Sequence, residues 1–186
     1  MHNFKKIYYF IDRFNFKDLS NIKKKVNIVY RNYQLYETQD IIKTREFCKK
    51  RKFKLYLANN IRLAIQLNLD GVYLPAFNNI SNYSNMKLKN KFTIIGSAHN
   101  IKELKIKENQ NCEEIFISPI FRTEKSTKYL EVIKFNNLAK ITRKKTICLG
   151  GINEKNFRRL RLTKSNGFAS ISWIKKNGLN KNLGRF

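Results

Sequence analysis

Short apolar segments recur along the chain at intervals of about 20 residues. Most of them are continuous rather than alternating, and they are rich in β-branched and aromatic residues. Continuous runs of this kind are typical of strands that are buried on both faces, as in a parallel sheet. The pattern predicts eight strands, over residues 7–11, 27–30, 53–57, 71–74, 92–95, 115–117, 146–149 and 168–171.

The segments between these strands place apolar residues three or four positions apart, which is the spacing of one helix face. They predict helices over residues 18–25 and 39–52, from Asn60, from Asn100, over 130–142, from Asn153, and briefly between Trp173 and Gly178. Asn100 is a good N-cap, and Glu103 completes a variant of the capping box. The segment from residue 78 to residue 90 is polar and irregular, and we expect only a short helix there.

Strands that alternate with helices indicate a parallel sheet. Eight such repeats in 186 residues favour a compact (β/α)8 TIM barrel, in the α/β class. The alternative is an open, doubly wound sheet, but no G-x-G-x-x-G sequence follows the first strand to indicate a dinucleotide-binding fold. We therefore expect one TIM-barrel domain over residues 1–186, with a loosely ordered tail after about residue 175.

Simple features of the sequence argue against several other protein classes. Hydrophobic residues make up 42% of the chain and charged residues 28%, so it should fold around a core. No apolar run reaches about 18 residues and the first residues lack a signal-peptide pattern, so we expect a cytoplasmic protein without a membrane span. Cys48, Cys112 and Cys148 form no C-x-x-C pair, so neither a zinc site nor a disulfide framework is indicated.

The formal net charge of +26 is the most unusual property of the composition. One interpretation is nucleic-acid binding. The other is compositional drift, because the chain is rich in residue types with A/T-rich codons and its basic residues are spread over almost every predicted helix. We favour drift and expect no specific nucleic-acid partner, although a positive field would also attract small phosphorylated substrates.

In a TIM barrel the site is built at the carboxyl ends of the strands. The residues at those positions are mainly hydroxyls, amides and basic groups: Asp12, Arg13, Arg31, Asn59, Tyr73, Ser97, His99, Ser118, Arg122, Thr123, Gly150, Gly151, Ser170 and Ser172. This set holds one carboxylate and one histidine, which argues against paired-acid hydrolysis and against a nucleophilic triad. Its hydroxyls and amides suit a phosphate ligand.

The last third of the chain gives the clearest candidate site. Gly150 and Gly151 end the seventh strand, and Ser172 ends the eighth, each just before a helix. Glycine permits close approach to backbone N–H groups, and a helix N-terminus carries partial positive charge. Two such turns side by side predict a cup for a phosphate monoester. The alternative interpretation is that Gly150 and Gly151 form only a tight turn.

Six segments in order resemble motifs of the thiamine phosphate synthase family and of its TenI (thiazole tautomerase) relatives. They are Tyr9-Phe10-Ile11-Asp12, Ile28-Val29-Tyr30-Arg31, Leu57-Ala58-Asn59-Asn60 with Asp70-Gly71-Val72-Tyr73-Leu74, Ile95-Gly96-Ser97-Ala98-His99, Ser118-Pro119-Ile120-Phe121-Arg122-Thr123 and Leu149-Gly150-Gly151-Ile152. Together they extend over most of the chain. The resemblance implies the same TIM-barrel fold.

The resemblance also implies a transferase that joins a hydroxymethylpyrimidine pyrophosphate to a thiazole phosphate, giving thiamine phosphate and pyrophosphate. The residues that would hold the thiazole phosphate by position are Gly150, Gly151, Ile171 and Ser172. Arg31 would reach the pyrophosphate, Ser97 would hydrogen-bond it, and Thr123 would line the thiazole side.

The metal site is where the chain departs most from the family. The family holds Mg²⁺ with two aspartates, and these align with Asn59 and Asn78. Asn59 also belongs to the implied substrate-binding set. An amide is neutral and is a weaker Mg²⁺ ligand than a carboxylate, so Mg²⁺ binding should weaken unless the phosphates of the substrate supply most of the ligands.

Other departures concern the substrate. Val29 and Tyr33 replace the Gln and Lys of the family's second strand. Lys128 follows two residues later than the corresponding family lysine and remains a candidate phosphate ligand. Pro119 stands where the tautomerases have a histidine, so tautomerase chemistry is not indicated.

Three hypotheses therefore remain open. The first is a divergent thiamine phosphate synthase, and the second is a non-catalytic or regulatory barrel that has kept the phosphate cup and lost the metal site. The third, which we favour least, is a basic barrel that binds nucleic acid. The sequence also leaves open whether the chain forms a homo-oligomer.

Overall fold

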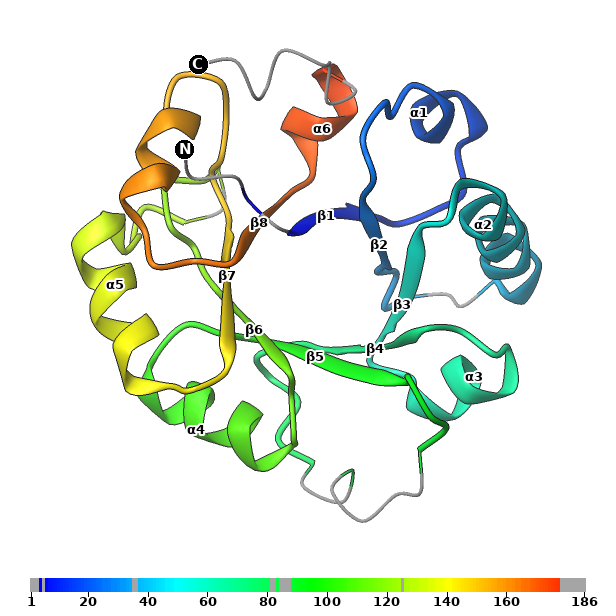
Figure 1. Ribbon diagram of the computed structural model, residues 1–186, viewed down its shortest axis with the longest axis horizontal. Coiled ribbons are helices and arrows are strands. Elements are labelled where there is room, and N and C mark those ends of the chain that lie inside the picture. The colour runs from blue at the N-terminus through cyan, green and yellow to red at the C-terminus, as the bar shows by residue number, and fades with distance from the viewer. Residues whose placement is uncertain are drawn as a thin grey trace.

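The computed structural model describes residue 4 and residues 6–34, 37–80, 83, 88–124 and 126–177. Its parallel strands close into a barrel in chain order, and β8 pairs with β1 (Figure 1). The strands are β1 (Lys6–Ile11), β2 (Asn27–Tyr30), β3 (Lys54–Ala58), β4 (Gly71–Leu74), β5 (Thr93–Ala98), β6 (Glu114–Ile117), β7 (Lys145–Leu149) and β8 (Gly167–Ser170). The predicted (β/α)8 barrel is confirmed, and the open doubly wound sheet is wrong.

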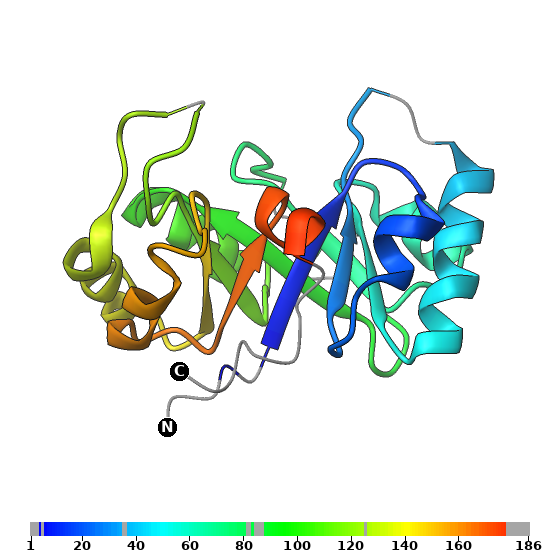
Figure 2. The same ribbon diagram turned by 90° about the horizontal axis from the view of Figure 1, so that it is seen from above.

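The helices surround the barrel (Figure 1). They are α1 (Phe16–Ser20), α2 (Thr38–Arg51), α3 (Ile61–Gln66), α4 (Ile101–Asn109), α5 (Glu131–Ile141), the 3₁₀ helix η2 (Phe157–Leu162) and α6 (Ser172–Asn177). Figure 2 shows the segments after β2 and β6 on the same side of the barrel as α6, at the carboxyl ends of the strands. This end is called the barrel mouth below.

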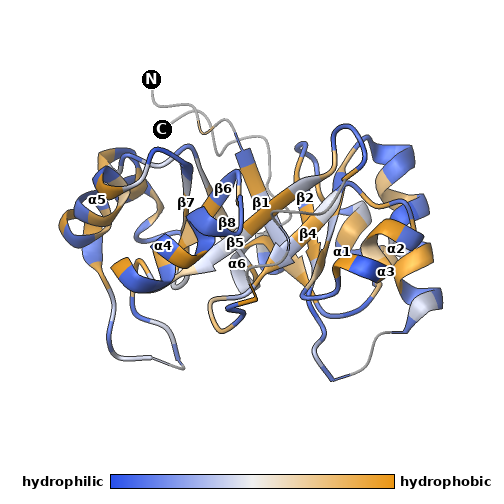
Figure 3. Ribbon diagram, turned by 90° about the horizontal axis from the view of Figure 1, so that it is seen from below, coloured by the Kyte–Doolittle hydropathy of each residue, from blue (hydrophilic) through white to orange (hydrophobic). Residues whose placement is uncertain are grey.

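Helices α2, α4 and α5 carry both hydrophobic and hydrophilic residues, and the connecting loops are mainly hydrophilic (Figure 3). Between β4 and β5 the described residues contain no α-helix, and the segment from residue 78 to residue 90, where we expect a short helix, is only partly described. Of the tail expected after about residue 175, residues 176 and 177 belong to α6, and the rest lies outside the described residues. In the described parts of the chain, no helix has both the length and the apolar character needed to cross a membrane.

Two helices differ from the prediction. The sequence pattern predicts α1 over residues 18–25, but the helix begins at Phe16 because the Asn15 side chain accepts the Asp18 N–H at 3.1 Å and caps it earlier. The segment from Asn153 forms a 3₁₀ helix in place of an α-helix. The side chains of Asn153 and Asn156 accept each other's backbone N–H, at 3.2 and 2.9 Å, and this turn occupies the place of the expected first α-helical turn.

Inward-facing side chains fill the barrel, as the alternation of a strand requires. The buried residues of this inner core are Tyr8, Phe10, Val29, Tyr56, Ala58, Tyr73, Ile95, Phe116, Ile147 and Ala169. The ring centre of Phe116 lies 4.8 Å from that of Tyr8 and 5.9 Å from that of Phe10. A ligand site above this core is therefore built from strand ends and loops.

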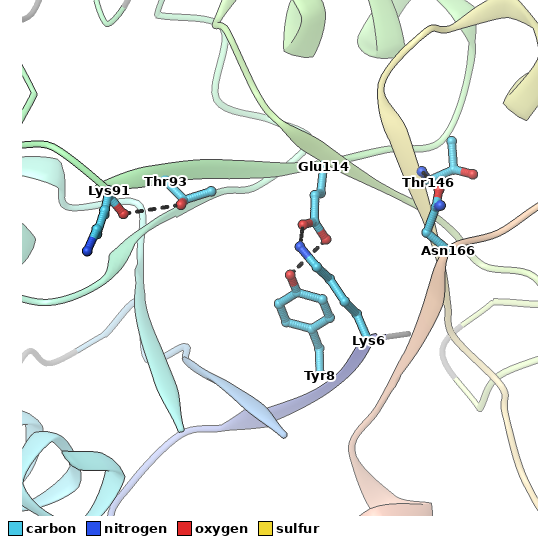
Figure 4. Close-up of polar contacts among 7 residues, drawn as sticks. All are labelled: Lys6, Tyr8, Lys91, Thr93, Glu114, Thr146 and Asn166. Carbon is cyan, nitrogen blue, oxygen red and sulfur yellow. Dashed lines mark hydrogen bonds and ion pairs between the residues drawn. The ribbon is translucent and has the colours of Figure 1, made fainter. Parts of the chain in front are cut away.

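The opposite end of the barrel holds a buried carboxylate, that of Glu114 (Figure 4). The Lys6 ammonium pairs with it, and the Tyr8 hydroxyl donates to it at 2.8 Å. Burial raises the pKa of Tyr8. Asp70, at the same end, accepts the Leu55 N–H at 2.9 Å. These groups lie at the amino ends of the strands, away from the mouth, and serve the fold.

Candidate functional site

Arg31 lies directly after β2, where its backbone N–H donates to the Ile11 carbonyl at 2.7 Å. Its guanidinium carbon lies 5.1 Å from the centre of the Phe10 ring, which is a cation–π distance. Phe10 belongs to the inner core, so its ring holds the guanidinium over the mouth. Within the described residues Arg31 forms no ion pair with a carboxylate. Its charge is therefore available to an anionic ligand.

A pocket of about 130 Å³ lies beside Arg31, between the ends of β1 and β8 and the helices α1 and α6. Arg13 and Lys175 add positive charge to its lining, and Asp12 and Asp18 add negative charge. Lys175 Nζ lies 3.6 Å from Asp18 Oδ2, so this ion pair joins α6 to α1. Sequence reasoning missed Lys175. Its position three residues after Ser172 in the same short helix is the signal that could have found it.

The residues predicted to form a phosphate cup follow neighbouring strands. β7 pairs with β8, with Leu149 opposite Ala169, so Gly150 and Gly151 follow one strand end and Ile171 and Ser172 follow the adjacent one. Both glycines have positive φ, 94° and 69°. The Gly151 N–H makes no hydrogen bond to any residue that the structure describes, and the first N–H groups of α6 have no partner within the helix. Backbone donors of two turns are thus brought together.

Position 151 requires glycine because the backbone φ is positive and because the site is closely packed. A Cβ there would lie 2.4 Å from the carbonyl oxygens of both Phe121 and Arg122. The Gly151 carbonyl accepts from Asn156 Nδ2 at 2.8 Å. Gly150 and Gly151 therefore form a tight turn, and this turn lies where a phosphate cup would need it.

The loop after β6 places Thr123 next to the cup. The backbones of Thr123 and Ser126 pair with each other at 3.2 and 3.4 Å. A Cβ on Gly150 would lie 3.7 Å from the Thr123 methyl group, so the two residues are neighbours. Lys128 is exposed, and its carbonyl accepts from the Ser126 hydroxyl at 2.9 Å.

Ser97 and His99 occupy the end of β5. The buried Tyr73 hydroxyl donates to Ser97 Oγ at 2.8 Å, which leaves the Ser97 proton free to be donated. Burial raises the pKa of Tyr73. His99 Nδ1 lies 2.7 Å from the Ser118 carbonyl oxygen and therefore carries a proton. These bonds connect β4, β5 and β6 at the mouth.

Asn59 and Asn78, the two residues at the family's metal positions, are in direct contact. Asn78 Nδ2 donates to Asn59 Oδ1 at 2.7 Å and lies 3.2 Å from the Tyr83 hydroxyl. Asn78 Oδ1 accepts the Ile80 N–H at 3.0 Å. Asn78 is buried, and Asn59 has a φ of 58°. The structure therefore brings the pair together as the resemblance implies, but as hydrogen-bonded amides.

A buried lysine lies next to this pair. Lys107 Nζ donates to the Asn78 carbonyl at 2.7 Å and to Gln110 Oε1 at 2.9 Å. Gln110 Nε2 donates to both oxygens of Asn78, at 3.0 and 3.1 Å. Burial lowers the pKa of Lys107 to about 8. Sequence reasoning missed both Lys107 and Gln110.

These residues do not fit a magnesium ion held by the protein, which is the metal that the resemblance implies. Mg²⁺ prefers anionic oxygens, but the side-chain oxygens of Asn59 and Asn78 are neutral and already accept hydrogen bonds. The Lys107 ammonium beside Asn78 would also repel a cation. In the described parts of the chain, no three His, Cys, Asp or Glu side chains cluster as metal ligands.

An aromatic pair forms the rim near Arg31. The rings of Tyr33 and Phe77 meet edge to face, with centres 5.5 Å apart, and both side chains are exposed. Tyr33 stands at the family's lysine position, and Phe77 directly precedes Asn78. Val29, at the family's Gln position, is buried in the inner core. Tyr33 thus places an aromatic ring at a position where the resemblance implies a lysine.

Solved structures with a similar fold include two thiamine phosphate pyrophosphorylases. The one from Pyrococcus furiosus has a TM-score of 0.76 and 17% identity, with 97% of this chain and 96% of that chain covered. The one from Bacteroides thetaiotaomicron has a TM-score of 0.59 and 18% identity, with 92% and 85% covered. N-(5'-phosphoribosyl)anthranilate isomerase from Pyrococcus furiosus also matches, with a TM-score of 0.65, 12% identity, and 93% and 90% covered. At these identities the likeness is one of fold.

No curated protein sequence matches the chain. Residues 22–174, however, match the family described as thiamine monophosphate synthase, which includes the TenI proteins. This match spans most of the chain and contains the carboxyl ends of strands β2 to β8. The chain therefore belongs to the thiamine monophosphate synthase family.

Proposed function

We propose that this protein is a thiamine-phosphate-synthase-like transferase. In the proposed reaction, the bond between the methylene carbon of the pyrimidine and its pyrophosphate oxygen breaks, and pyrophosphate leaves with the electron pair. The ring nitrogen of the thiazole phosphate then donates its lone pair to the resulting pyrimidine cation. The products are thiamine phosphate and pyrophosphate.

The observation that supports this proposal is that two candidate anion-binding places lie at one mouth. The first is the cup of Gly150, Gly151, Ile171 and Ser172, which would hold the thiazole phosphate through backbone N–H groups and a hydroxyl. The second is the guanidinium of Arg31, held over Phe10 without a carboxylate partner among the described residues. Two places of this kind suit a reaction between two phosphorylated substrates.

The remaining candidates take supporting roles in the proposal. Ser97 would donate its proton to the pyrophosphate, since its oxygen already accepts from Tyr73. Thr123, next to Gly150, would line the thiazole side, and Lys128 would reach a phosphate from the same loop. The protein supplies no magnesium ligands in this proposal, and any Mg²⁺ would arrive bound to the substrate phosphates.

A second candidate function is a non-catalytic barrel that binds a phosphate ligand. The Asn59–Asn78 pair favours it, because the family's two carboxylates are replaced by neutral amides while the cup is kept. Negative charge develops on the pyrophosphate as it leaves. A protein without the two carboxylates that hold Mg²⁺ has fewer positive groups to balance that charge.

Purified protein given both substrates, with Mg²⁺ and separately with EDTA, tests the proposal. Thiamine phosphate well above the protein-free background is the expected result. Absence of product from a folded protein that still binds thiazole phosphate in a calorimetric titration would favour the non-catalytic function. Failure to bind thiazole phosphate would reject both.

Ser172→Ala is the appropriate variant for the cup in these measurements. Gly151→Asp is unsuitable, because its Cβ would collide with the Phe121 and Arg122 carbonyl oxygens and disturb the fold itself. Ser172 is exposed, and its hydroxyl can be removed without leaving a buried cavity.

A further inference from the structure

The amides at the family's metal positions have one fixed arrangement. The Ile80 N–H can only donate, and it lies 3.0 Å from Asn78 Oδ1, which sets the orientation of that amide. Asn78 Nδ2 then faces Asn59, so the Asn59 atom at 2.7 Å must be its oxygen. One backbone donor thus fixes both side chains.

The same pair connects three parts of the barrel. Asn59 follows β3, and its backbone N–H donates to the Tyr73 carbonyl in β4 at 2.8 Å. Asn78 lies in the segment after β4. Lys107, in α4, and Gln110, at its end, both donate to the Asn78 carbonyl. The ends of β3 and β4 are therefore fastened to the helix that follows β5.

We propose that the Asn59–Asn78 pair is a metal-free latch that holds this side of the mouth in its binding shape, so that phosphate-bearing ligands bind without a divalent cation. Two carboxylates at these positions would need a cation between them, since like charges repel. An amide N–H of Asn78 that faces the amide oxygen of Asn59 joins the same two loops without a cation. The claim about ligand binding rests on the proposed function, whereas the claim about the latch does not.

The two positions respond differently to substitution. Asn59→Asp keeps an oxygen to accept from Asn78 Nδ2, so the latch should survive. Asn78→Asp removes the group that donates to Asn59 Oδ1 and sets a carboxylate oxygen against that atom. It also removes the N–H that the Tyr83 hydroxyl accepts. Asn137→Asp, exposed on α5, adds the same charge far from the mouth and is the matched control.

Thermal unfolding of these variants in EDTA tests the latch. Asn78→Asp should lower Tm by about 3–8 °C, since a buried donor and its acceptor are lost, and Asn59→Asp should stay within about 2 °C of the wild type. Adding about 10 mM Mg²⁺ should change the wild-type Tm by less than about 1 °C. The latch is rejected if Asn78→Asp is as stable as Asn137→Asp. It is also rejected if Mg²⁺ stabilises the wild type by several degrees and Asn78→Leu removes that effect.

Calorimetric titration with inorganic pyrophosphate tests the claim about the ligand. The Kd measured in EDTA should lie within about threefold of the Kd measured with Mg²⁺. A loss of about tenfold or more in EDTA would overturn metal-free binding. No binding in either buffer would reject the proposed phosphate site, while the thermal measurements would still decide the latch.

Discussion

One group orients the charge of Arg31, and a different group would neutralise it. The Phe10 ring holds the guanidinium, and among the described residues no carboxylate neutralises it. A phosphate of the ligand would do so. Arg31→Ala should therefore weaken pyrophosphate binding by about 10- to 100-fold, as expected for the loss of charge-assisted hydrogen bonds. Its Tm should change little, because the side chain is not fully buried.

Arg62→Ala, on the exposed face of α3, is the matched control for the loss of one positive charge. Calorimetric titration with pyrophosphate compares the two variants. Equal weakening in both would show that Arg31 contributes only to the overall positive field.

Among individual residues, the sequence located some of the hydrogen-bonded side chains at the mouth and not others. The resemblance placed Asn59 and Asn78 at the mouth, but their mutual hydrogen bond depends on the path of the loop after β4. Lys107 could not be foreseen from its residue type, because lysine is rarely buried. Its only signal is its position three residues after Leu104, on the face of α4 that packs inward.

At the scale of the element, α4 has the best-defined beginning. The Asn100 side chain accepts the Glu103 N–H at 2.9 Å, and Glu103 Oε2 accepts the His99 N–H at 2.7 Å. Asn100→Ala should cost about 1–2 kcal/mol, which corresponds to a Tm lower by about 3–6 °C. The exposed Lys102→Ala in the same turn should lie within about 1 °C of the wild type. Equal Tm values for the two variants would mean that the cap does not hold α4.

Sequence patterns predicted strands better than helices. Strand positions were predicted well because continuous apolar runs can be buried in only one way in a closed parallel barrel. α1 and η2 were less well predicted because short side-chain hydrogen bonds decide where they begin. Asn15 competes successfully as a cap for α1, and the mutual bonds of Asn153 and Asn156 form a turn before η2.

At the scale of the whole molecule, topology accounts for most of what could be predicted about the site. All strands run parallel in a closed barrel, so every residue that follows a strand lies at one mouth. Gly150 and Ser172 therefore follow adjacent strand ends although 22 positions separate them in the sequence. The roles of these residues depend on the ligand and stay predictions.

The molecule also carries three buried thiols that contribute to its stability at alkaline pH. Burial raises the pKa values of Cys48, Cys112 and Cys148 to about 12 each, from an ordinary value of 9.0. Above about pH 9 the unfolded chain releases these protons while the folded chain keeps them, so this contribution to stability is lost as pH rises. Lys107 acts in the opposite sense, since its lowered pKa means that the folded state releases a proton which the unfolded chain keeps.

Three thiols against one lysine leave two net protons from these four groups, so the free energy of unfolding should fall between about pH 9 and 10, approaching about 1.4 kcal/mol per pH unit for each of these protons. Burial also raises the pKa values of five tyrosines, Tyr8, Tyr9, Tyr30, Tyr56 and Tyr73, which steepen the fall toward pH 10. Urea unfolding at pH 8, 9 and 10 measures this fall. In a variant with all three cysteines changed to alanine, the five buried tyrosines still favour a fall toward pH 10 and Lys107 opposes it, so stability should fall clearly less than in the unaltered chain. A fall of equal size in both proteins would contradict a thiol origin, because only the unaltered chain has thiols to ionise on unfolding.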